Sequence, residues 1–418
     1  MKSEEFATAV LLTLLLSAFT ATHSLARSVV YDDNVRTLQV VVNNDWLSPP
    51  VMQLGSSDVL NVSFDELSHI YHRYLYRLER CEADWTTSDG LFESDWLAGF
   101  NENPIEDYEN SLNTTVLYTH YSLQIPNERC RLKMSGNYRL HIIDDDDGGR
   151  EVLCAEFMVV RKLMDVGLGV TTNTDIDVNV SHQQVDMTVN YRSLSVTNTS
   201  DQLRTVVMQN GREDTQRINP KPTYTLSGQL KWEHCRELIF DAGNEYHKFE
   251  MLDLSHPTMG VDRIRWDGQN YHVFPFPQAP RRNYVYDEDA DGAFFIRNSD
   301  NIEIERTCDY AWVHFNMTGA DDYADDVIVV GNWTTSADDS QYLLDYDATT
   351  RTYSGAVLLK QGYYNYQFML RDAKGAVRLM PEEGSFFDTE NRYQALVYYK
   401  GITDRTWQLV GYQQVVLK

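Results

Sequence analysis

The sequence lacks the short motifs that mark most enzymes. It contains no GxSxG elbow, no HExxH or GxGxxG pattern, no Walker loop and no cysteine in a catalytic context. A carboxylate pair for glycoside hydrolysis could be assembled from many of the 62 acidic residues, and this freedom makes such a pair uninformative. We therefore expect a protein that is not an enzyme, with no catalytic residues and no cofactor-binding residues.

Positive charge is also scarce. The chain has 36 lysine and arginine residues against 62 acidic ones, which gives a formal net charge of −26. The acidic residues are spread along the whole chain, so the surface field should repel phosphate backbones and anionic lipid headgroups. This balance argues against nucleic acid as a partner and against binding to a membrane surface.

Long apolar runs are missing after residue 26. The one such run, "FATAVLLTLLLSAFTATHSLA" at residues 6–26, ends in Ser24-Leu25-Ala26, a small-x-small pattern typical of a signal-peptidase site. A membrane-spanning helix needs about 18 apolar residues, and no later stretch approaches that length. We interpret residues 1–26 as a signal peptide, with a retained anchor helix as the alternative. We expect no membrane insertion of the remainder.

Cysteine is rare, and its spacing fits no CxxC metal or redox motif. Five positions carry it: Cys81, Cys130, Cys154, Cys235 and Cys308. An odd number cannot pair completely within the chain. In an oxidising compartment one disulfide could form, with Cys130 and Cys154 the nearest pair in sequence, and buried free thiols are the alternative. The spacing therefore predicts no metal ligands.

What the chain does have is strand-forming sequence. Aromatic residues make up 12% of it, and Val and Thr occur in short stretches broken by Asn, Asp and Gly. We predict an all-β fold of consecutive immunoglobulin-like antiparallel β-sandwich domains. The pattern loosens after Arg161, and a new succession of strands begins near Cys308. We expect an N-terminal β-sandwich at 27–162, a middle β-rich domain at 163–303 and a C-terminal immunoglobulin-like or early-set sandwich at 304–418.

One segment imitates the opening of a calcium loop. In "YDEDADG" the carboxylates of Asp287, Asp289 and Asp291 alternate before Gly292, as such a loop requires. The twelfth position should be a bidentate Glu and is Asn298, and no helices are predicted on either side. We favour a solvated hairpin turn, with a calcium site as the alternative.

Two further segments contain metal-ligand types. "DDDDGG" at 144–149 lies between two predicted strands, and its Asp-Gly and Gly-Gly pairs suit a tight hairpin, so we interpret it as a turn rather than a metal site. His69 and His72 are three residues apart, which places them on opposite faces of a strand. They would share a metal only in a helix, and we expect them to pack beside Tyr71 and Tyr74.

Whole phrases of the sequence resemble a known family. "SPPVMQLGSSDVLNVSFDEL", "YLYRLERCEADWTTSD", "YENSLNTTVLYTHYSLQIPN", "FDAGNEYHKFE", "YVYDEDADGAFFI" and "CDYAWVHFNM" are similar to phrases of the type IX secretion system plug proteins of Bacteroidota, over about residues 35–415. One departure is Arg80 before Cys81, where the family phrase has His.

This resemblance implies a function. A plug protein is periplasmic, lies at the inner face of the outer membrane and has no catalytic residues. It docks on the periplasmic opening of the very large outer-membrane translocon barrel and seals it while no cargo is present. The partner implied is that barrel. Trp85, Trp96 and Tyr108 on predicted loops are candidate contacts because aromatic residues dominate interface energetics, and buried anchors are the alternative for them.

The C-terminal part also resembles glycogen- and starch-binding modules. Gly331, Trp333 and Thr334 fit the first pattern of these modules, and Tyr364, Tyr366 and Phe368 behind Gly362 fit the second. The place of the stacking tryptophan holds Ser336, and that of the sugar-contacting lysine holds Gln367. In a strand Tyr364, Tyr366 and Phe368 share one face, which we predict to be core. A secreted carbohydrate-binding or carbohydrate-processing protein remains the alternative function.

Overall fold

The computed structural model describes residues 28–417, and the predicted signal peptide lies outside them. Strands dominate the described residues, which confirms the all-β prediction. The helices described are one-turn segments: α2 (Glu93–Trp96), α3 (Thr199–Gln202), α4 (Ile304–Thr307) and the 3₁₀ turns η1 (Glu213–Thr215), η2 (Arg236–Leu238), η3 (Asp339–Tyr342) and η4 (Pro381–Glu383). None of the helices between residues 28 and 417 is long and apolar enough to cross a membrane.

The first sandwich packs two antiparallel sheets around one core. One sheet contains β1 (Val29–Val30), β12 (Arg150–Val160), β11 (Gly136–Asp144), β5 (Tyr74–Cys81) and β7 (Asn103–Pro104), with β3 (Val51–Gln53) parallel to β12. The other contains β2 (Val35–Val42), β4 (Leu60–Glu66), β9 (Thr119–Ile125) and β8 (Asp107–Asn110), and β6 (Leu97–Gly99) and β10 (Cys130–Leu132) form a small pair. Alternate residues such as Tyr138, Leu140 and Ile142 enter the core because side chains of a strand alternate.

The second sandwich is built from two distant parts of the chain. Its first sheet contains β13 (Asp165–Thr171), β14 (His182–Asn190), β18 (Gln229–Trp232), β17 (Tyr224–Leu226) and β19 (Ile239–Asp241). Its second contains β16 (Arg217–Ile218), β15 (Leu203–Gln209), β30 (Asn391–Tyr399) and β31 (Gln408–Leu417). Val207 and Val397 from the two parts meet in one core with Trp232.

The third sandwich is one sheet that folds over its own core. Its strands follow the order β20 (His247–Met251), β28 (Gly362–Arg371), β25 (Asp326–Val330), β26 (Leu343–Asp347), β27 (Thr352–Lys360), β24 (Tyr310–Thr318), β22 (Tyr271–Pro275) and β21 (Val261–Trp266), and β23 (Phe294–Ile296) and β29 (Val377–Leu379) also pair with β28. The sheet changes direction at β26, since Leu344 pairs with β25 and Asp345 pairs with β27.

Strand pairing differs from the predicted division at 303/304. Strands β20 and β23 precede that point and pair with β28, which follows it. The last two strands leave the third sandwich, and β30 pairs with β15 from Leu203↔Tyr399 to Gln209↔Tyr393. The third sandwich is thus inserted between β19 and β30 of the second. Strand propensity and alternation identify strands but not their partners, so the sequence pattern did not reveal this insertion.

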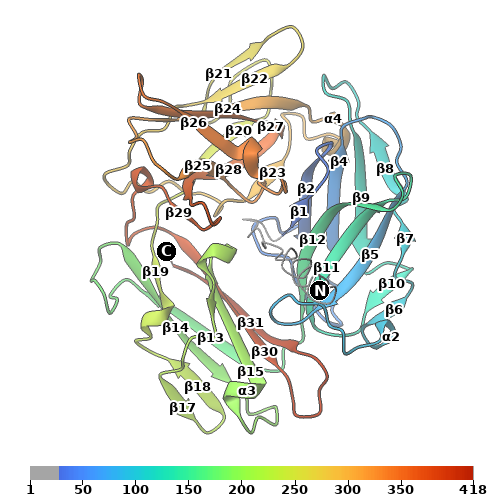
Figure 1. Ribbon diagram of the computed structural model, residues 1–418, viewed down its shortest axis with the longest axis vertical. Helices are drawn as coiled ribbons and strands as arrows, with labels where there is room; N and C mark the ends of the chain where they lie inside the picture. Colours follow the sequence, from blue (N-terminus) through green and yellow to red (C-terminus); the bar gives the residue numbers. More distant parts are fainter. Residues whose placement is uncertain (1–27, 418) are drawn as a thin grey trace, which may run out of the picture.

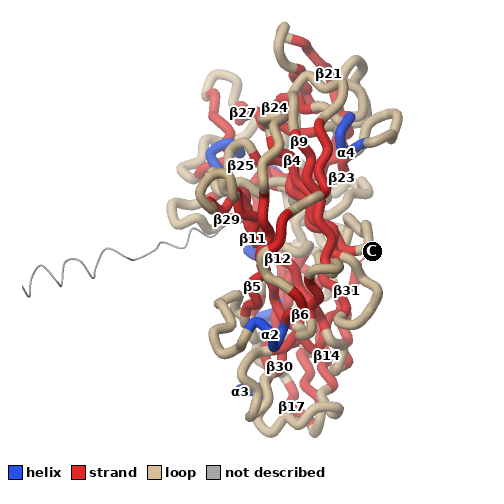
Figure 2. Tube along the Cα trace, turned by 90° about the vertical axis from the view of Figure 1, so that its right-hand side faces the viewer, coloured by secondary structure: helices blue, strands red, loops and turns tan. Residues whose placement is uncertain are grey.

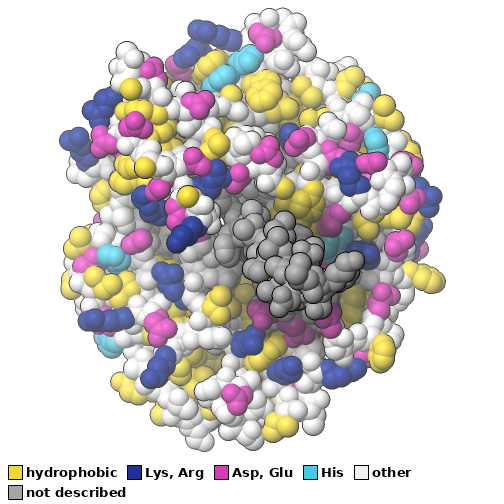
Figure 3. Space-filling model, viewed as in Figure 1, with side chains coloured by type: hydrophobic (Ala, Val, Ile, Leu, Met, Phe, Trp, Pro, Cys, Tyr) yellow, Lys and Arg dark blue, Asp and Glu magenta, His cyan; other side chains and the backbone are white. Residues whose placement is uncertain are grey.

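The three sandwiches lie around a common centre. Figure 1 shows the first sandwich (blue to teal) on one side, with the third (yellow to orange) and the second (green and red) on the other. The body is much narrower when turned by 90° (Figure 2), so the molecule is a flattened, three-lobed plate. Acidic side chains are scattered over the broad face in Figure 3 and do not gather in one patch.

Candidate functional site

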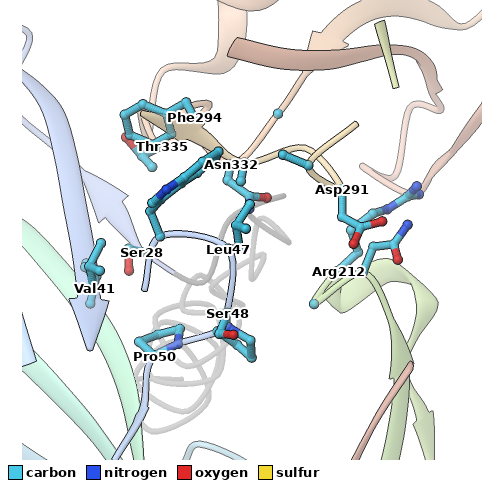
Figure 4. Close-up of a pocket in the computed structure, with 18 of the residues that line it drawn as sticks. Ser28, Val41, Leu47, Ser48, Pro50, Arg212, Asp291, Phe294, Asn332 and Thr335 are labelled. Atoms are coloured by element: carbon cyan, nitrogen blue, oxygen red, sulfur yellow. The ribbon is translucent and has the colours of Figure 1, made fainter. Parts of the chain in front are cut away.

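A cavity of about 190 Å³ lies where the three sandwiches meet. Each of them supplies part of its wall. Trp46 and Leu47 come from the loop after β2, Arg212 follows β15 and Arg392 belongs to β30. Asp291 and Asn332 come from the third sandwich. In Figure 4, Val41 and Pro50 lie on one side of the cavity, and Arg212 and Asp291 lie across from them. The cavity therefore depends on the relative placement of all three lobes.

Two carboxyl groups beside this cavity are partly buried. Asp291 lies 3.5 Å from the Nη2 atom of Arg392, but burial outweighs this attraction and raises the pKa of Asp291 to about 6. Asp289 accepts hydrogen bonds from the backbone nitrogens of Asp291, at 2.8 Å, and of Tyr246. Burial, followed by the nearby charge of Asp291, raises the pKa of Asp289 to about 8. Both groups favour the protonated form more than free aspartate does.

The calcium-like segment does not gather its three carboxylates. Asp287 is exposed and lies 2.6 Å from Nζ of Lys248, whereas Asp289 and Asp291 are directed to the partners described above. Within residues 28–417, the groups of three or more clustered metal-ligand side chains lie elsewhere, in the first sandwich. The described geometry gives the calcium alternative no support.

A buried ion pair joins the first sandwich to the third. Nζ of Lys360 lies 2.6 Å from Oδ2 of Asp65. The other oxygen of Asp65 is 2.7 Å from Nδ1 of His120, and the hydroxyl of Tyr310 donates to Oδ2 at 2.7 Å. Burial opposes ionisation of Asp65, but Lys360 and His120 outweigh it and hold the pKa of Asp65 below its usual value.

Arg80 joins the first sandwich to the second. Its guanidinium donates to Oγ of Ser88 at 2.7 Å and to the carbonyl of Ser135 at 2.9 Å within the first sandwich. It also donates to Oγ1 of Thr406 and the carbonyl of Trp407, both at 2.5 Å, in the segment before β31. Arginine has five donors in a fixed fork, so it can serve four partners at once. The departure from the family phrase at this position is therefore a contact between lobes.

The side chain of Gln183 anchors the segment that connects the third sandwich to the second. Nε2 of Gln183 donates to the carbonyls of Phe387 and Thr389, at 2.9 and 2.8 Å. Oε1 of Gln183 accepts from the hydroxyl of Tyr393 at 2.7 Å and from Nδ2 of Asn391 at 3.0 Å. Because Gln183 is fully buried and its amide is satisfied on both sides, the segment that leads from the third sandwich into β30 is fixed in place.

The three aromatic residues proposed as contacts occupy different environments. Trp96 is a core residue of the first sandwich, with its ring 5.9 Å from that of Tyr138. Trp85 is partly buried and packs where the first and second sandwiches meet. Tyr108 is 44% exposed on the edge strand β8, and its ring centroid lies 4.6 Å from that of the equally accessible Tyr71. Of the three, Tyr108 remains a candidate for contact with a partner.

The aromatic stretch of β28 is core, as predicted. Tyr364, Tyr366 and Phe368 are each at most 1% exposed and belong to the core of the third sandwich. Asn365 and Gln367, on the opposite face, are buried as well. Asn365 accepts from the backbone nitrogen of Ala290, and Gln367 donates to the carbonyl of Asn244 at 2.8 Å. The position that holds a lysine in the carbohydrate-binding modules therefore faces protein here.

The acidic turn and the two histidines lie near each other. Residues 144–149 connect β11 to its antiparallel neighbour β12, with positive φ at Gly148 and Gly149, so the hairpin prediction is confirmed. His69 and His72 lie in the loop between β4 and β5, which corrects their assignment to a strand. The loop turns sharply, with φ of 59° at His69. His72, rather than both histidines, lies beside Asp144, with 3.4 Å between Nδ1 and Oδ2.

All five cysteines are free and buried. This corresponds to the free-thiol alternative of the sequence analysis. Cys130 lies on β10 and Cys154 on β12, in different sheets. Burial raises the pKa of each thiol, most strongly at Cys154.

Comparison with known proteins shows what this architecture resembles. Residues 35–161, the first sandwich, match the family model of the type 9 secretion system plug protein 1st domain. A crystal structure of a hypothetical protein from Parabacteroides merdae is 34% identical and has a TM-score of 0.90. The match covers 94% of this chain and 100% of that one. The chain belongs to the type 9 secretion system plug family.

Other comparisons add nothing to this assignment. An alkylpurine DNA glycosylase from Pseudomonas fluorescens bound to DNA is 12% identical over 32% of this chain and 30% of its own, with a TM-score of 0.16. No curated protein matches the chain.

Sequence reasoning missed the residues that join the lobes of this plug-family protein. Asp65 occupies a strand position next to the inward-facing Phe64, and the third sandwich covers the face on which Asp65 lies. The one available signal was Arg80, which departs from the family phrase directly before a strand ends. A charged residue at an outward strand position gives, in the sequence alone, no indication that a second domain covers it.

Proposed function

We propose that this protein is a non-catalytic plug that binds the periplasmic opening of the type IX secretion translocon barrel and seals it when no cargo is present. Membership of the plug family carries this proposal. Localisation at the inner face of the outer membrane, after removal of residues 1–26, is part of the same proposal. Cargo would then release the plug because cargo-bound and plug-bound states of the barrel compete.

The shape of the molecule supports this role. A wide pore is closed by area, and the three lobes form a plate whose broad face (Figure 1) is much larger than its profile (Figure 2). A plate of separate domains would bend under load if its lobes were only tethered. Lys360 and Arg80 join the first lobe to the third and to the second, and Gln183 anchors the segment that connects the third lobe to the second.

We propose that one edge of the first sandwich contacts the translocon. Ile70, Tyr71 and Tyr108 are 63%, 47% and 44% exposed and lie together beside the edge strand β8. Exposed aromatic residues of this kind become anchors when a partner buries them. The edge strand β8 also has unpaired backbone groups, to which a strand of the partner could form hydrogen bonds.

Affinity purification from the native host tests the proposal. A tagged copy is isolated from detergent-solubilised outer membrane, and the proteins that co-purify are identified by mass spectrometry. We expect a large β-barrel protein to be recovered, and recovery of no envelope protein would refute the plug role. In the Tyr71→Ala/Tyr108→Ala variant the yield of the barrel should fall at least tenfold. The matched control is Tyr224→Ala in the second sandwich, where Tyr224 is 51% exposed.

The carbohydrate alternative has weaker support. The rings that match the sugar-binding pattern are buried, and Gln367 is turned to the carbonyl of Asn244. Affinity electrophoresis through starch or glycogen separates the two functions. We expect unchanged mobility, and retarded mobility would favour the carbohydrate-binding function.

A further inference from the structure

Three potential metal ligands gather on the outer face of the first sandwich. His141 of β11 and Cys154 of β12 are direct partners across the two strands. Glu151 lies on the same strand as Cys154. One ligand atom from each of these residues lies within 4.8 Å of the other two. They lie on the sheet face opposite the core, where the side chain of Glu151 is 38% exposed and Cys154 is buried beneath it.

A β-bulge places Glu151 in this group. In regular alternation the residue two before Cys154 is Val152, and Val152 would lie on the outer face. Pairing shifts between Ile142↔Leu153 and Ile143↔Glu151, so Val152 is left out of the ladder and enters the core with Leu153. Glu151 then takes the outward place. Bulges commonly redirect a side chain at a functional position, and here the redirected side chain is a carboxylate beside an imidazole.

The imidazole of His141 lies between two carboxylates. Its Nδ1 atom is 2.7 Å from Oε1 of Glu151, and its Nε2 atom is 3.3 Å from Oε2 of Glu79 on β5. In metal sites the histidine binds the ion through one nitrogen and donates a hydrogen bond from the other to a carboxylate. Glu79 occupies the position of that second partner. A proton on Nε2, donated to Glu79, would leave Nδ1 on the side of Glu151 for the ion.

We propose that His141, Glu151 and Cys154 bind a zinc ion. The ligands are Nδ1 of His141, a carboxylate oxygen of Glu151 and the Cys154 thiolate, with water in the fourth tetrahedral position. Thiolate, imidazole and carboxylate together are a set that Zn²⁺ favours. Binding displaces the proton between His141 and Glu151 and the thiol proton of Cys154, and both protons pass to solvent. The ion would join β11 and β12 on the outer face of their sheet.

A second cluster in the same sandwich is the natural competitor. His72, Asp144 and Asp146 also hold ligand atoms close together. One oxygen of each carboxylate is already engaged, because Oδ1 of Asp144 accepts from the backbone nitrogens of Asp146 and Asp147, and Oδ2 of Asp146 accepts from that of Arg73 at 2.8 Å. This cluster also lacks a sulfur ligand. We therefore assign zinc to the His141 site.

Titration of the purified protein with metal tests the assignment. The full protein is stripped with a chelator and titrated with Zn²⁺ by calorimetry, and separately with Co²⁺ in an absorbance cell. We expect one ion per chain, release of protons to the buffer, and a thiolate-to-cobalt charge-transfer band. Cys154→Ser should remove the band and weaken zinc binding at least tenfold. Glu79→Gln should weaken it by about ten- to a hundredfold, the usual effect of an outer hydrogen-bond partner, and keep the band.

Two matched variants serve as controls. Cys235→Ser replaces a thiol with the same 6% exposure as Cys154, and it should leave the band and the affinity unchanged. If Cys154→Ser does not fold, Glu151→Gln replaces it, because Glu151 is partly exposed and should tolerate the change. Absence of zinc binding overturns the assignment. So does binding that survives Cys154→Ser and Glu151→Gln but disappears in His72→Gln.

Discussion

The ammonium group of Lys360 and the carboxylate of Asp65 lie 2.6 Å apart across the boundary of two lobes, and each side chain is only 1% exposed. Neither charged group is accessible to water, so each relies on the other as its main counter-charge. A buried pair of this kind adds little compared with apolar packing, but loss of one partner leaves the other charge buried without its main counter-charge.

Replacement of Lys360 should therefore be costly. We expect Lys360→Met to lower the free energy of unfolding by about 3–5 kcal/mol, measured by urea denaturation. The matched control is Arg351→Met, which breaks an exposed pair with Asp321 and should cost at most about 1 kcal/mol. The double variant Asp65→Asn/Lys360→Met should recover part of the loss. Equal effects of Lys360→Met and Arg351→Met would contradict the buried pair.

Arg80 should be intolerant of a conservative change. Lysine keeps the charge but cannot form the fork that serves Ser88, Ser135 and Trp407 together. Each partner left unsatisfied costs about 1–3 kcal/mol, so Arg80→Lys should lower the thermal midpoint by several degrees. Arg405→Lys, at an exposed arginine, should leave it unchanged. An unchanged midpoint in Arg80→Lys would show that the four contacts do not stabilise the junction.

Stability should fall as the medium becomes more alkaline. The pKa of Asp289 rises from 3.8 to about 8 on folding, so between these values the folded state holds a proton that the unfolded state has lost. The stabilisation is complete below the unfolded pKa and is lost as the pH rises through the folded pKa. We expect the free energy of unfolding to be lower at about pH 8 than at about pH 6.

Asn substitution distinguishes this carboxyl from the others. Asp289→Asn mimics the protonated form and should flatten the decline toward pH 8, whereas Asp287→Asn at the exposed neighbour should leave it intact. The measurement is chemical denaturation at a series of pH values. A slope that persists in Asp289→Asn would assign the proton uptake to another group.

Restoring the lysine of the carbohydrate-binding pattern should not restore a sugar site. Gln367 is 3% exposed and faces the carbonyl of Asn244. Gln367→Lys would bury an unpaired ammonium, at a cost of about 3 kcal/mol or more in the free energy of unfolding. We expect lower stability and no retardation in glycogen gels. Retardation of a stable Gln367→Lys protein would argue that the sandwich retains a carbohydrate surface.

The sequence was sufficient for the local structure and for the family. Alternation in β28 correctly assigned Tyr364, Tyr366 and Phe368 to a core, and the Asp-Gly and Gly-Gly pairs correctly located the hairpin between β11 and β12. Both depend on neighbours within a few residues. Such signals are present in any single sequence.

Contacts between distant segments could not be predicted in this way. The insertion of the third sandwich, the pairing of Asp65 with Lys360 and the outward turn of Glu151 each depend on a partner strand or domain. Alternation would have placed Val152 outside, and a single unpaired residue in the ladder reversed that assignment. Residues far apart in the chain that meet in space leave no local pattern in one sequence.

The return of β30 and β31 to the second sandwich sets an order of assembly. As the polypeptide emerges with its N-terminal end first, every strand of the third lobe is available before the second lobe receives its closing hairpin. The third sandwich can therefore complete its strand pairing while the second is still incomplete, with the edge of β15 that pairs with β30 left open. A chain truncated before Asn391 would thus lack β30 and β31, which complete the second sandwich, but would contain every strand of the third.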